Sequence, residues 1–231
     1  MAIRLLPFRD YNEHDVVNLY RSAGNLSDFI DLSDSTKRST PEGDAGVFVK
    51  VSNGVLNSSA TDWDPVDVES NPASLLGKTD YPHVGRNTYP TVALSVTGVN
   101  SNSDQCIGVT LRQTVARDEL GENLLYNPIK KDELYGVLPG EAVPVLSRGL
   151  VTLTSDAFDG TPAVGEALVP STLGKASGIA YGLLSASDNN IGTVLAEGFR
   201  DDYTNSAGGT NVFGKQGLQS GNYYVVKLNC A

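Results

Sequence analysis

The sequence of 231 residues contains few of the side chains on which catalysis depends. It has two histidines, two cysteines, one tryptophan and one methionine, and only 19% of its residues are charged. Histidine is the most frequent general base and a common metal ligand, so acid–base catalysis at neutral pH has few candidate residues here. We therefore expect no enzymatic activity, no cofactor and no metal site.

Two glycine–lysine pairs resemble part of a nucleotide-binding loop but lack its first glycine. Pro72 stands at that position before Gly77-Lys78-Thr79, and Val169 stands there before Gly174-Lys175. Without these glycines the backbone N–H groups cannot form the phosphate cradle. Both segments are therefore interpreted as turns with an exposed lysine.

The chain also lacks excess positive charge and long apolar runs. Its formal net charge is −10, so its surface repels the phosphates of nucleic acids. No segment approaches the roughly 20 consecutive apolar residues that span a bilayer. The opening apolar run is too short for a signal peptide and is interrupted by Pro7. We expect a protein that stays in the cytoplasm where it is made and binds neither nucleic acid nor membrane.

Acidic residues cluster around the single tryptophan, Trp63. Asp62, Asp64, Asp67 and Glu69 do not have the spacing of an EF-hand calcium loop. We interpret the segment as a solvated acidic loop, with an adventitious Ca²⁺ site or a hydrolytic carboxylate pair as the alternatives.

The remaining candidate groups each have a structural interpretation. Cys106 and Cys230 belong to no CxxC or histidine-rich cluster. They are interpreted as two buried, reduced thiols, and a disulfide that anchors the C-terminus is the alternative. His83, between Pro82 and Val84, is interpreted as a turn or interface residue.

What the sequence does contain is glycine, proline and short alternating apolar stretches. There are 24 glycines and 11 prolines, and polar turn residues separate the apolar runs. Alternation of apolar and polar residues is typical of half-buried strands. It predicts strands at 47–51, 92–97 and 107–112, with a hairpin turn at Asn53-Gly54. Apolar runs bounded by Gly, Pro, Asp or Asn predict further strands at 142–146, 150–154, 179–184, 191–197 and 223–228.

Other segments are predicted as loops or as a short helix. Residues 12–20 form either a short amphipathic helix capped by Asn12 or no helix, because the Val16-Val17 pair is β-branched. Residues 24–43 and 203–221 read as long loops. The predicted fold class is mostly β: a small antiparallel β-barrel or sandwich with long loops and an N-terminal arm.

The predicted organisation is an N-terminal arm and loop over residues 1–45, followed by a β-rich domain over 46–231. A faint echo between Ser74-Leu75-Leu76-Gly77-Lys78 and Ser171-Thr172-Leu173-Gly174-Lys175 allows two β units, 46–135 and 136–231. The shared pattern is too short to establish a duplication.

The last part of the chain has an ordered series of glycine and valine motifs. The series runs through Gly140-x-x-Val143-x-Val145-x-x-x-Gly149-x-Val151, Gly165-x-x-Leu168, Ile191-Gly192-x-Val194-Leu195 and Lys227-Leu228. This order resembles the small β-barrel capsid cement (decoration) proteins of tailed bacteriophages, over residues 136–231. The opening residues 3–11 also resemble the start of a cyanophage or marine-phage virion protein. Residues 1–135 make this chain longer than the smallest cement proteins.

The resemblance implies a structural virion protein on the outer surface of the capsid, without cofactor or catalysis. Its partners would be the major capsid protein and neighbouring copies of itself. The apolar start suits strand addition or docking into a groove, so the candidate capsid-interface residues are Ile3, Leu5, Leu6 and Phe8. The alternative is that these residues form an edge strand of the protein's own sheet. The alternatives are another phage component, such as a tail, fibre or head-associated protein, a carbohydrate-binding module, or a carboxylate-based hydrolase.

Overall fold

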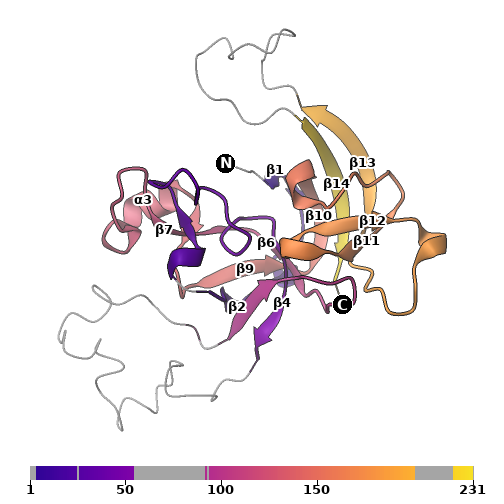
Figure 1. The fold of residues 1–231 in the computed structure, drawn as a ribbon, viewed down its shortest axis with the longest axis horizontal. Helices are drawn as coiled ribbons and strands as arrows, with labels where there is room; N and C mark the ends of the chain where they lie inside the picture. Colours follow the sequence, from indigo (N-terminus) through magenta and orange to yellow (C-terminus); the bar gives the residue numbers. More distant parts are fainter. Residues whose placement is uncertain (1–3, 25, 55–91, 93, 201–220, 231) are drawn as a thin grey trace.

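The computed structural model describes residues 4–24, 26–54, 92, 94–200 and 221–230. It is mostly β and contains a small closed barrel and antiparallel sheet (Figure 1), so the predicted fold class is confirmed. The predicted continuation of the Asn53-Gly54 hairpin, the loop at 203–221, Trp63 with its acidic neighbours, Gly77-Lys78-Thr79 and His83 lie outside the described residues, wholly or in their main part.

The barrel closes through five short strands. All neighbours are antiparallel except β2 and β5, which are parallel. The strands follow one another around the barrel in the order β2 (Val16–Ser22), β5 (Ser95–Gly98), β4 (Phe48–Asn53), β6 (Gly108–Thr110) and β9 (Ala142–Leu146).

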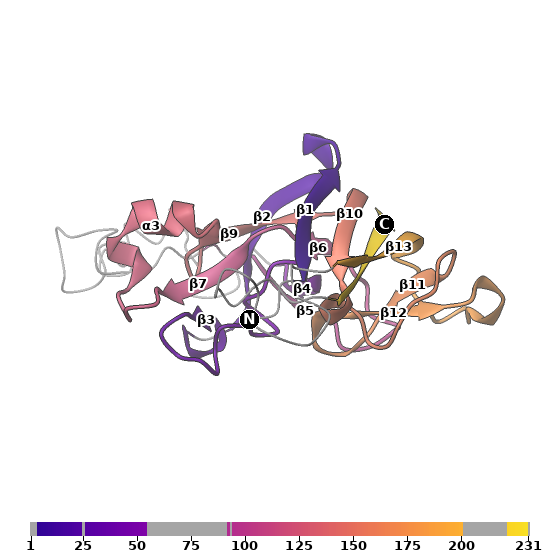
Figure 2. The same cartoon turned by 90° about the horizontal axis from the view of Figure 1, so that it is seen from above.

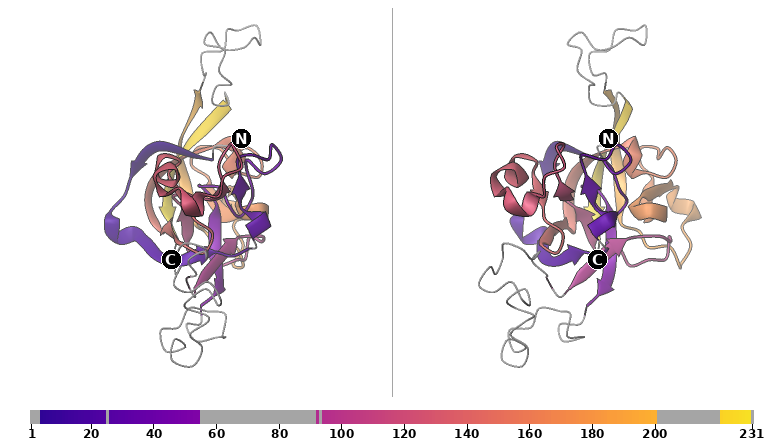
Figure 3. Two further views of the ribbon diagram at one scale, coloured as in Figure 1. Left: turned by 90° about the vertical axis from the view of Figure 1, so that its left-hand side faces the viewer. Right: turned by 60° about the vertical axis from the view of Figure 1, so that its left-hand side comes forward.

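A six-stranded antiparallel sheet lies beside the barrel, and Figure 2 shows the two side by side from above. Its longest strands, β13 and β14, extend as a two-stranded ribbon beyond the body of the molecule (Figure 3). The order across the sheet is β1 (Leu5–Asp10), β10 (Arg148–Thr154), β14 (Gly221–Asn229), β13 (Gly192–Arg200), β11 (Ala167–Pro170) and β12 (Ala176–Ile179).

A third, parallel sheet and one short helix form a small unit outside the barrel. The sheet consists of β3 (Ile30–Asp31), β7 (Gln113–Arg117) and β8 (Gly136–Val137). The helix is α3 (Pro128–Glu133), whose cap Asn127 accepts a hydrogen bond from the backbone N–H of Lys130. Lys130 also pairs with the buried carboxylate of Asp118 at 3.3 Å, which fastens α3 to the chain that follows β7.

Single 3₁₀ turns connect many of these strands. They are η1 (Glu13–Asp15), η2 (Leu26–Asp28), η3 (Leu124–Tyr126), η4 (Ser155–Ala157), η5 (Thr172–Gly174) and η6 (Tyr181–Leu183).

Two pairs of consecutive strands, β1 with β2 and β9 with β10, each continue from one sheet into the other. Together they form a bent two-stranded ribbon that belongs to both the barrel and the six-stranded sheet. β2 pairs with β9 in the barrel, and β1 pairs with β10 in the sheet. Between these pairs the backbone N–H and the hydroxyl of Ser147 both donate to the carbonyl of Asp15, each at 2.9 Å. At Gly149, with φ of +136°, an added Cβ would lie 2.6 Å from the Cβ of Tyr11. The bend therefore requires glycine at this position.

We expect Gly149→Ala to lower the free energy of unfolding by about 1 to 3 kcal/mol, because the methyl group would meet backbone and Cβ atoms that cannot rotate away. Urea denaturation measures the change. Gly182→Ala is the matched control, since nothing lies within 4 Å of its added Cβ, and it should stay within about 0.5 kcal/mol of the wild type. Equal stability of the two variants would contradict the interpretation of Gly149 as the bend.

The main hydrophobic core lies between barrel and sheet. Phe48 faces this core, whereas Val47 and Val49 face a second cluster, because successive side chains of a strand point to opposite faces. Phe158 and Tyr224 meet within the main core with their rings 5.1 Å apart and nearly perpendicular. The main core includes side chains from Leu5 to Cys230.

The predicted segment boundaries do not coincide with units of this fold. The predicted arm at 1–45 contributes β1 to the large sheet, β2 to the barrel and β3 to the small sheet. The single main core also joins residues on both sides of the boundary between 135 and 136. The described residues of this segment are therefore part of the folded body.

The structure decides one alternative that the sequence left open and shows that one predicted strand was wrong. Residues 12–20 form one 3₁₀ turn and then β2; Asn12 does cap the turn, accepting from the N–H of His14 at 3.1 Å. The β-branched Val16 and Val17 instead pair with β9. The strand predicted at 179–184 ends at Ile179, and η6 follows.

Candidate interaction surfaces

The predicted capsid-interface residues are mostly buried in the protein's own sheet. Leu5 and Leu6 are 9% and 8% exposed, and Leu5 pairs with Leu153 of β10. Phe8 is 64% exposed, and Ile3 lies outside the described residues. Of the two interpretations, a free arm and an edge strand, the structure has the edge strand, because these leucines find their apolar partners within the fold. Of the three described candidates, only Phe8 is available to a partner.

The edges of the large sheet are poorly suited to strand addition. Pro7 in β1 has no N–H to offer an added strand, which is a common protection of sheet edges. At the other edge, β12 has four residues, and Phe158 forms a bridge to Ala176 at its start. Contacts through side chains are therefore favoured over sheet extension.

A buried ion pair fixes the chain just ahead of β1. Nε of Arg4 lies 3.4 Å from Oδ2 of Asp44 without the geometry of a hydrogen bond. Asp44 also accepts from the hydroxyl of Ser39 at 2.6 Å, and Arg4 donates through Nη1 to the carbonyl of Leu173 at 3.4 Å. Burial raises the pKa of Asp44 and lowers that of Arg4, and their mutual attraction opposes both shifts. The pair links the N-terminus to residues far along the chain.

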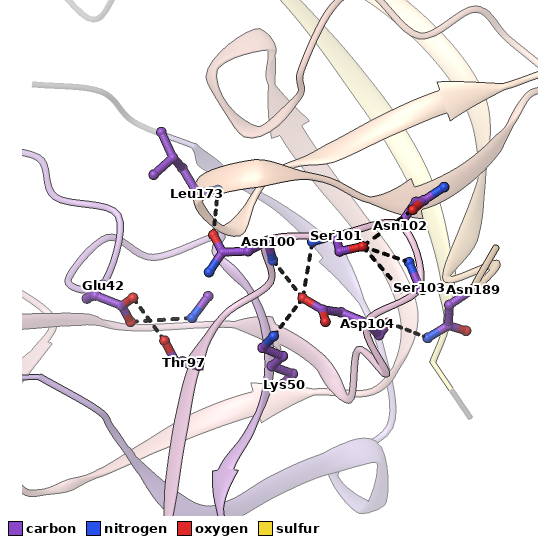
Figure 4. A network of polar contacts seen from close by, with 11 residues as sticks. Glu42, Lys50, Thr97, Asn100, Ser101, Asn102, Ser103, Asp104, Leu173 and Asn189 are labelled. Carbon is purple, nitrogen blue, oxygen red and sulfur yellow. Dashed lines mark hydrogen bonds and ion pairs between the residues drawn. The ribbon is translucent and has the colours of Figure 1, made fainter. Parts of the chain in front are cut away.

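The loop between β5 and β6 is organised by Asp104 (Figure 4). Its carboxylate accepts from Nζ of Lys50 at 2.8 Å and from the backbone N–H of Asn100 and Ser101 at 2.8 and 3.1 Å. Together these hydrogen bonds and the charge of Lys50 outweigh desolvation, so the pKa of Asp104 is lowered. Asn189 donates to the Asp104 carbonyl at 2.9 Å. This network joins the barrel to the loop before β13 and is interpreted as structural.

One group of exposed apolar side chains lies on the small unit around α3. Ile129 is 74% exposed, although large apolar side chains are usually buried. The other members, flanking η3 and α3, are Leu120, Tyr126 and Tyr135. We call this group the α3 end. The sequence signal for it is the Asn127-Pro128 pair, a typical helix start, which alternation of apolar and polar residues does not indicate.

A second group lies at the open end of the β11–β12 hairpin, opposite its turn and away from the barrel. At this open end Ala167 of β11 pairs with Ile179 of β12. Val164 before it and Leu183 after it are 56% and 74% exposed. Together with Tyr181 they form what we call the hairpin end. Figures 1 and 2 place α3 and the β11–β12 hairpin toward opposite ends of the long axis.

The remaining sequence predictions concern a metal site, the Gly174-Lys175 pair and membrane-spanning segments. Within it, no three or more His, Cys, Asp or Glu side chains are grouped so that they could hold a metal ion. Gly174 ends the 3₁₀ turn η5 and lies close to Gly98, so the predicted turn is present, but Lys175 is half-buried and not exposed as predicted. No helix in the described ranges is long and apolar enough to cross a membrane.

The cysteines, far apart in sequence, meet in the core. Both are free and buried, and their sulfur atoms are 4.0 Å apart. The hydrogen bond to Cys106, together with burial, raises the pKa of the Cys230 thiol.

Comparisons of this chain with protein-family models, with curated proteins and with solved structures found no match.

Proposed function

We propose that this chain is a structural virion protein of a tailed bacteriophage that binds the outer surface of the capsid. There it stabilises contacts between major capsid protein subunits, next to further copies of itself. The observation behind the proposal is the pair of exposed apolar groups, the α3 end and the hairpin end, at opposite ends of the long axis. A protein that bridges two neighbours needs two separated contact surfaces.

The series of motifs that resembles cement proteins is consistent with this role. Residues 136–231 contribute the barrel strand β9 and all strands of the large sheet except β1. Gly140, Gly149 and Gly165 of that series have positive φ angles, which glycine adopts most readily. The backbone conformation thus explains why glycine occupies these motif positions. The valines between them pack in the hydrophobic clusters.

We expect each end to be needed for binding, because two linked contacts strengthen each other by about 10²- to 10⁴-fold. Two double variants test this: Tyr126→Ser with Ile129→Ser at the α3 end, and Val164→Ser with Leu183→Ser at the hairpin end. Each should reduce occupancy on purified capsid shells that lack the protein by at least about tenfold, with little change in Tm. Occupancy is measured by sedimentation and by cryo-electron microscopy.

Leu19→Ser is the matched control, because Leu19 is 58% exposed on β2 and belongs to neither end. It should bind shells like the wild type. Normal binding by both folded double variants would contradict the two-ended contact. Failure of the wild type to bind any shell would contradict the capsid function itself.

A further inference from the structure

A cleft of about 500 Å³ opens beside the barrel strands β2 and β9. It shares Tyr135 with the α3 end and shares no residue with the hairpin end. This volume lies within the range of small-molecule sites, roughly 300 to 1,000 Å³. About half of the wall is apolar and is formed by Val16, Leu111, Val137, Ala142 and Pro144. Tyr11, Glu13, Asn18, Arg112 and Tyr135 complete the lining.

Arg112 is the only cation in this lining, and it is half-buried. Its guanidinium carbon lies 4.5 Å from the ring centroid of Tyr135, a cation–π contact. Among the described residues, no carboxylate lies within ion-pair distance of this guanidinium, and no acceptor receives a hydrogen bond from it. Several N–H donors of a planar fork are thus available to a molecule in the cleft.

Tyr135 occupies a backbone position that favours glycine. It follows the end of α3 with φ of +54°, in the left-handed region, and its N–H donates to the carbonyl of Asp132 at 3.0 Å. Glycine is the usual residue at such a helix end. A strained residue of this kind points to a function of its side chain, and here the tyrosine ring stands against Arg112 at the cleft.

We propose that this cleft binds a small organic carboxylate with an apolar, ring-sized body. Arg112 binds the carboxylate, since the guanidinium fork matches its two oxygens, and the apolar wall with Tyr11 and Tyr135 encloses the body. A single negative charge is favoured over a phosphate dianion, because Glu13 lies in the lining and the chain is acidic overall. This inference does not depend on the capsid function.

The test uses 3-phenylpropionate as the probe and its uncharged analogue 3-phenylpropanamide as the ligand control. Titration of the ¹⁵N-labelled full chain should give saturable shifts at the amides of Arg112, Tyr135 and Val137. The amide should bind at least about tenfold more weakly, since it loses a charge-assisted hydrogen bond. Absence of saturable shifts with the carboxylate, or equal affinity for the two probes, would overturn the proposal.

Protein variants separate the charge from the fold. Arg112→Gln should lose at least about tenfold in affinity for 3-phenylpropionate, whereas Glu13→Gln should bind about two- to fivefold more tightly because a repelling charge is removed. Arg148→Gln is the matched control: Arg148 is exposed and outside the cleft lining, and its affinity should be unchanged. Native amide dispersion confirms folding of each variant. Wild-type affinity in a folded Arg112→Gln protein would refute the site.

Discussion

Deleting residues 1–8 is expected to lower the free energy of unfolding by more than about 5 kcal/mol. Burial of Leu5 and Leu6 contributes roughly 1.5 to 3 kcal/mol each, and both are more than nine-tenths buried. Removing Arg4 also leaves the carboxylate of Asp44 buried without its cation, and breaking a buried pair costs about 3 to 5 kcal/mol. Because domains are stable by only about 5 to 15 kcal/mol, the truncated chain should be largely unfolded or strongly destabilised.

Thermal and urea unfolding of the truncated and full-length chains measure this effect. Phe8→Ser is the matched control, because Phe8 lies in the same segment but is 64% exposed; its stability should stay within about 0.5 kcal/mol of the wild type. A truncated protein with unchanged Tm would instead support the free arm that the sequence first indicated.

Linking Cys106 to Cys230 is expected to raise the free energy of unfolding by about 3 to 5 kcal/mol. The two residues are 124 positions apart in sequence, and a cross-link that closes a loop of about 100 residues restricts the unfolded chain by close to 4.7 kcal/mol in the chain-entropy model. The sulfur atoms must approach from 4.0 Å to about 2.05 Å. Rotation of the two side chains can supply part of that approach.

The thiols should be reduced and slow to react in the native protein, since both are buried and the pKa of Cys230 is raised. Alkylation followed by mass spectrometry should find both modified only after denaturation. Prolonged treatment with diamide, which takes up the two hydrogen atoms of the thiols, should then give an intramolecular disulfide. Dithiothreitol should reverse the stabilisation. A linked monomer that is no more stable than the reduced protein would contradict this prediction.

Apolar runs bounded by turn residues were a reliable guide to several strands. Strand β9 has the bounds predicted from the sequence, and the predicted strands at 150–154 and 223–228 lie within β10 and β14. Such a run and its bounding residues are local properties of the sequence, so the prediction holds without knowledge of the pairing partner. In segment 12–20 the sequence left a helix and no helix open, and pairing with β9 outweighed the weak helical pattern.

The sequence by itself determined the mostly β class, many of the strands and the glycines needed at turns, because backbone preference and alternation are encoded within a few residues. Only the tertiary structure decided that Leu5 and Leu6 pack in the chain's own sheet, that Cys106 meets Cys230, and that Arg112 stacks on Tyr135. An apolar residue indicates that it will be buried but not against which surface. Contacts between distant residues depend on how the strands pair, and that pairing is set by the whole core at once.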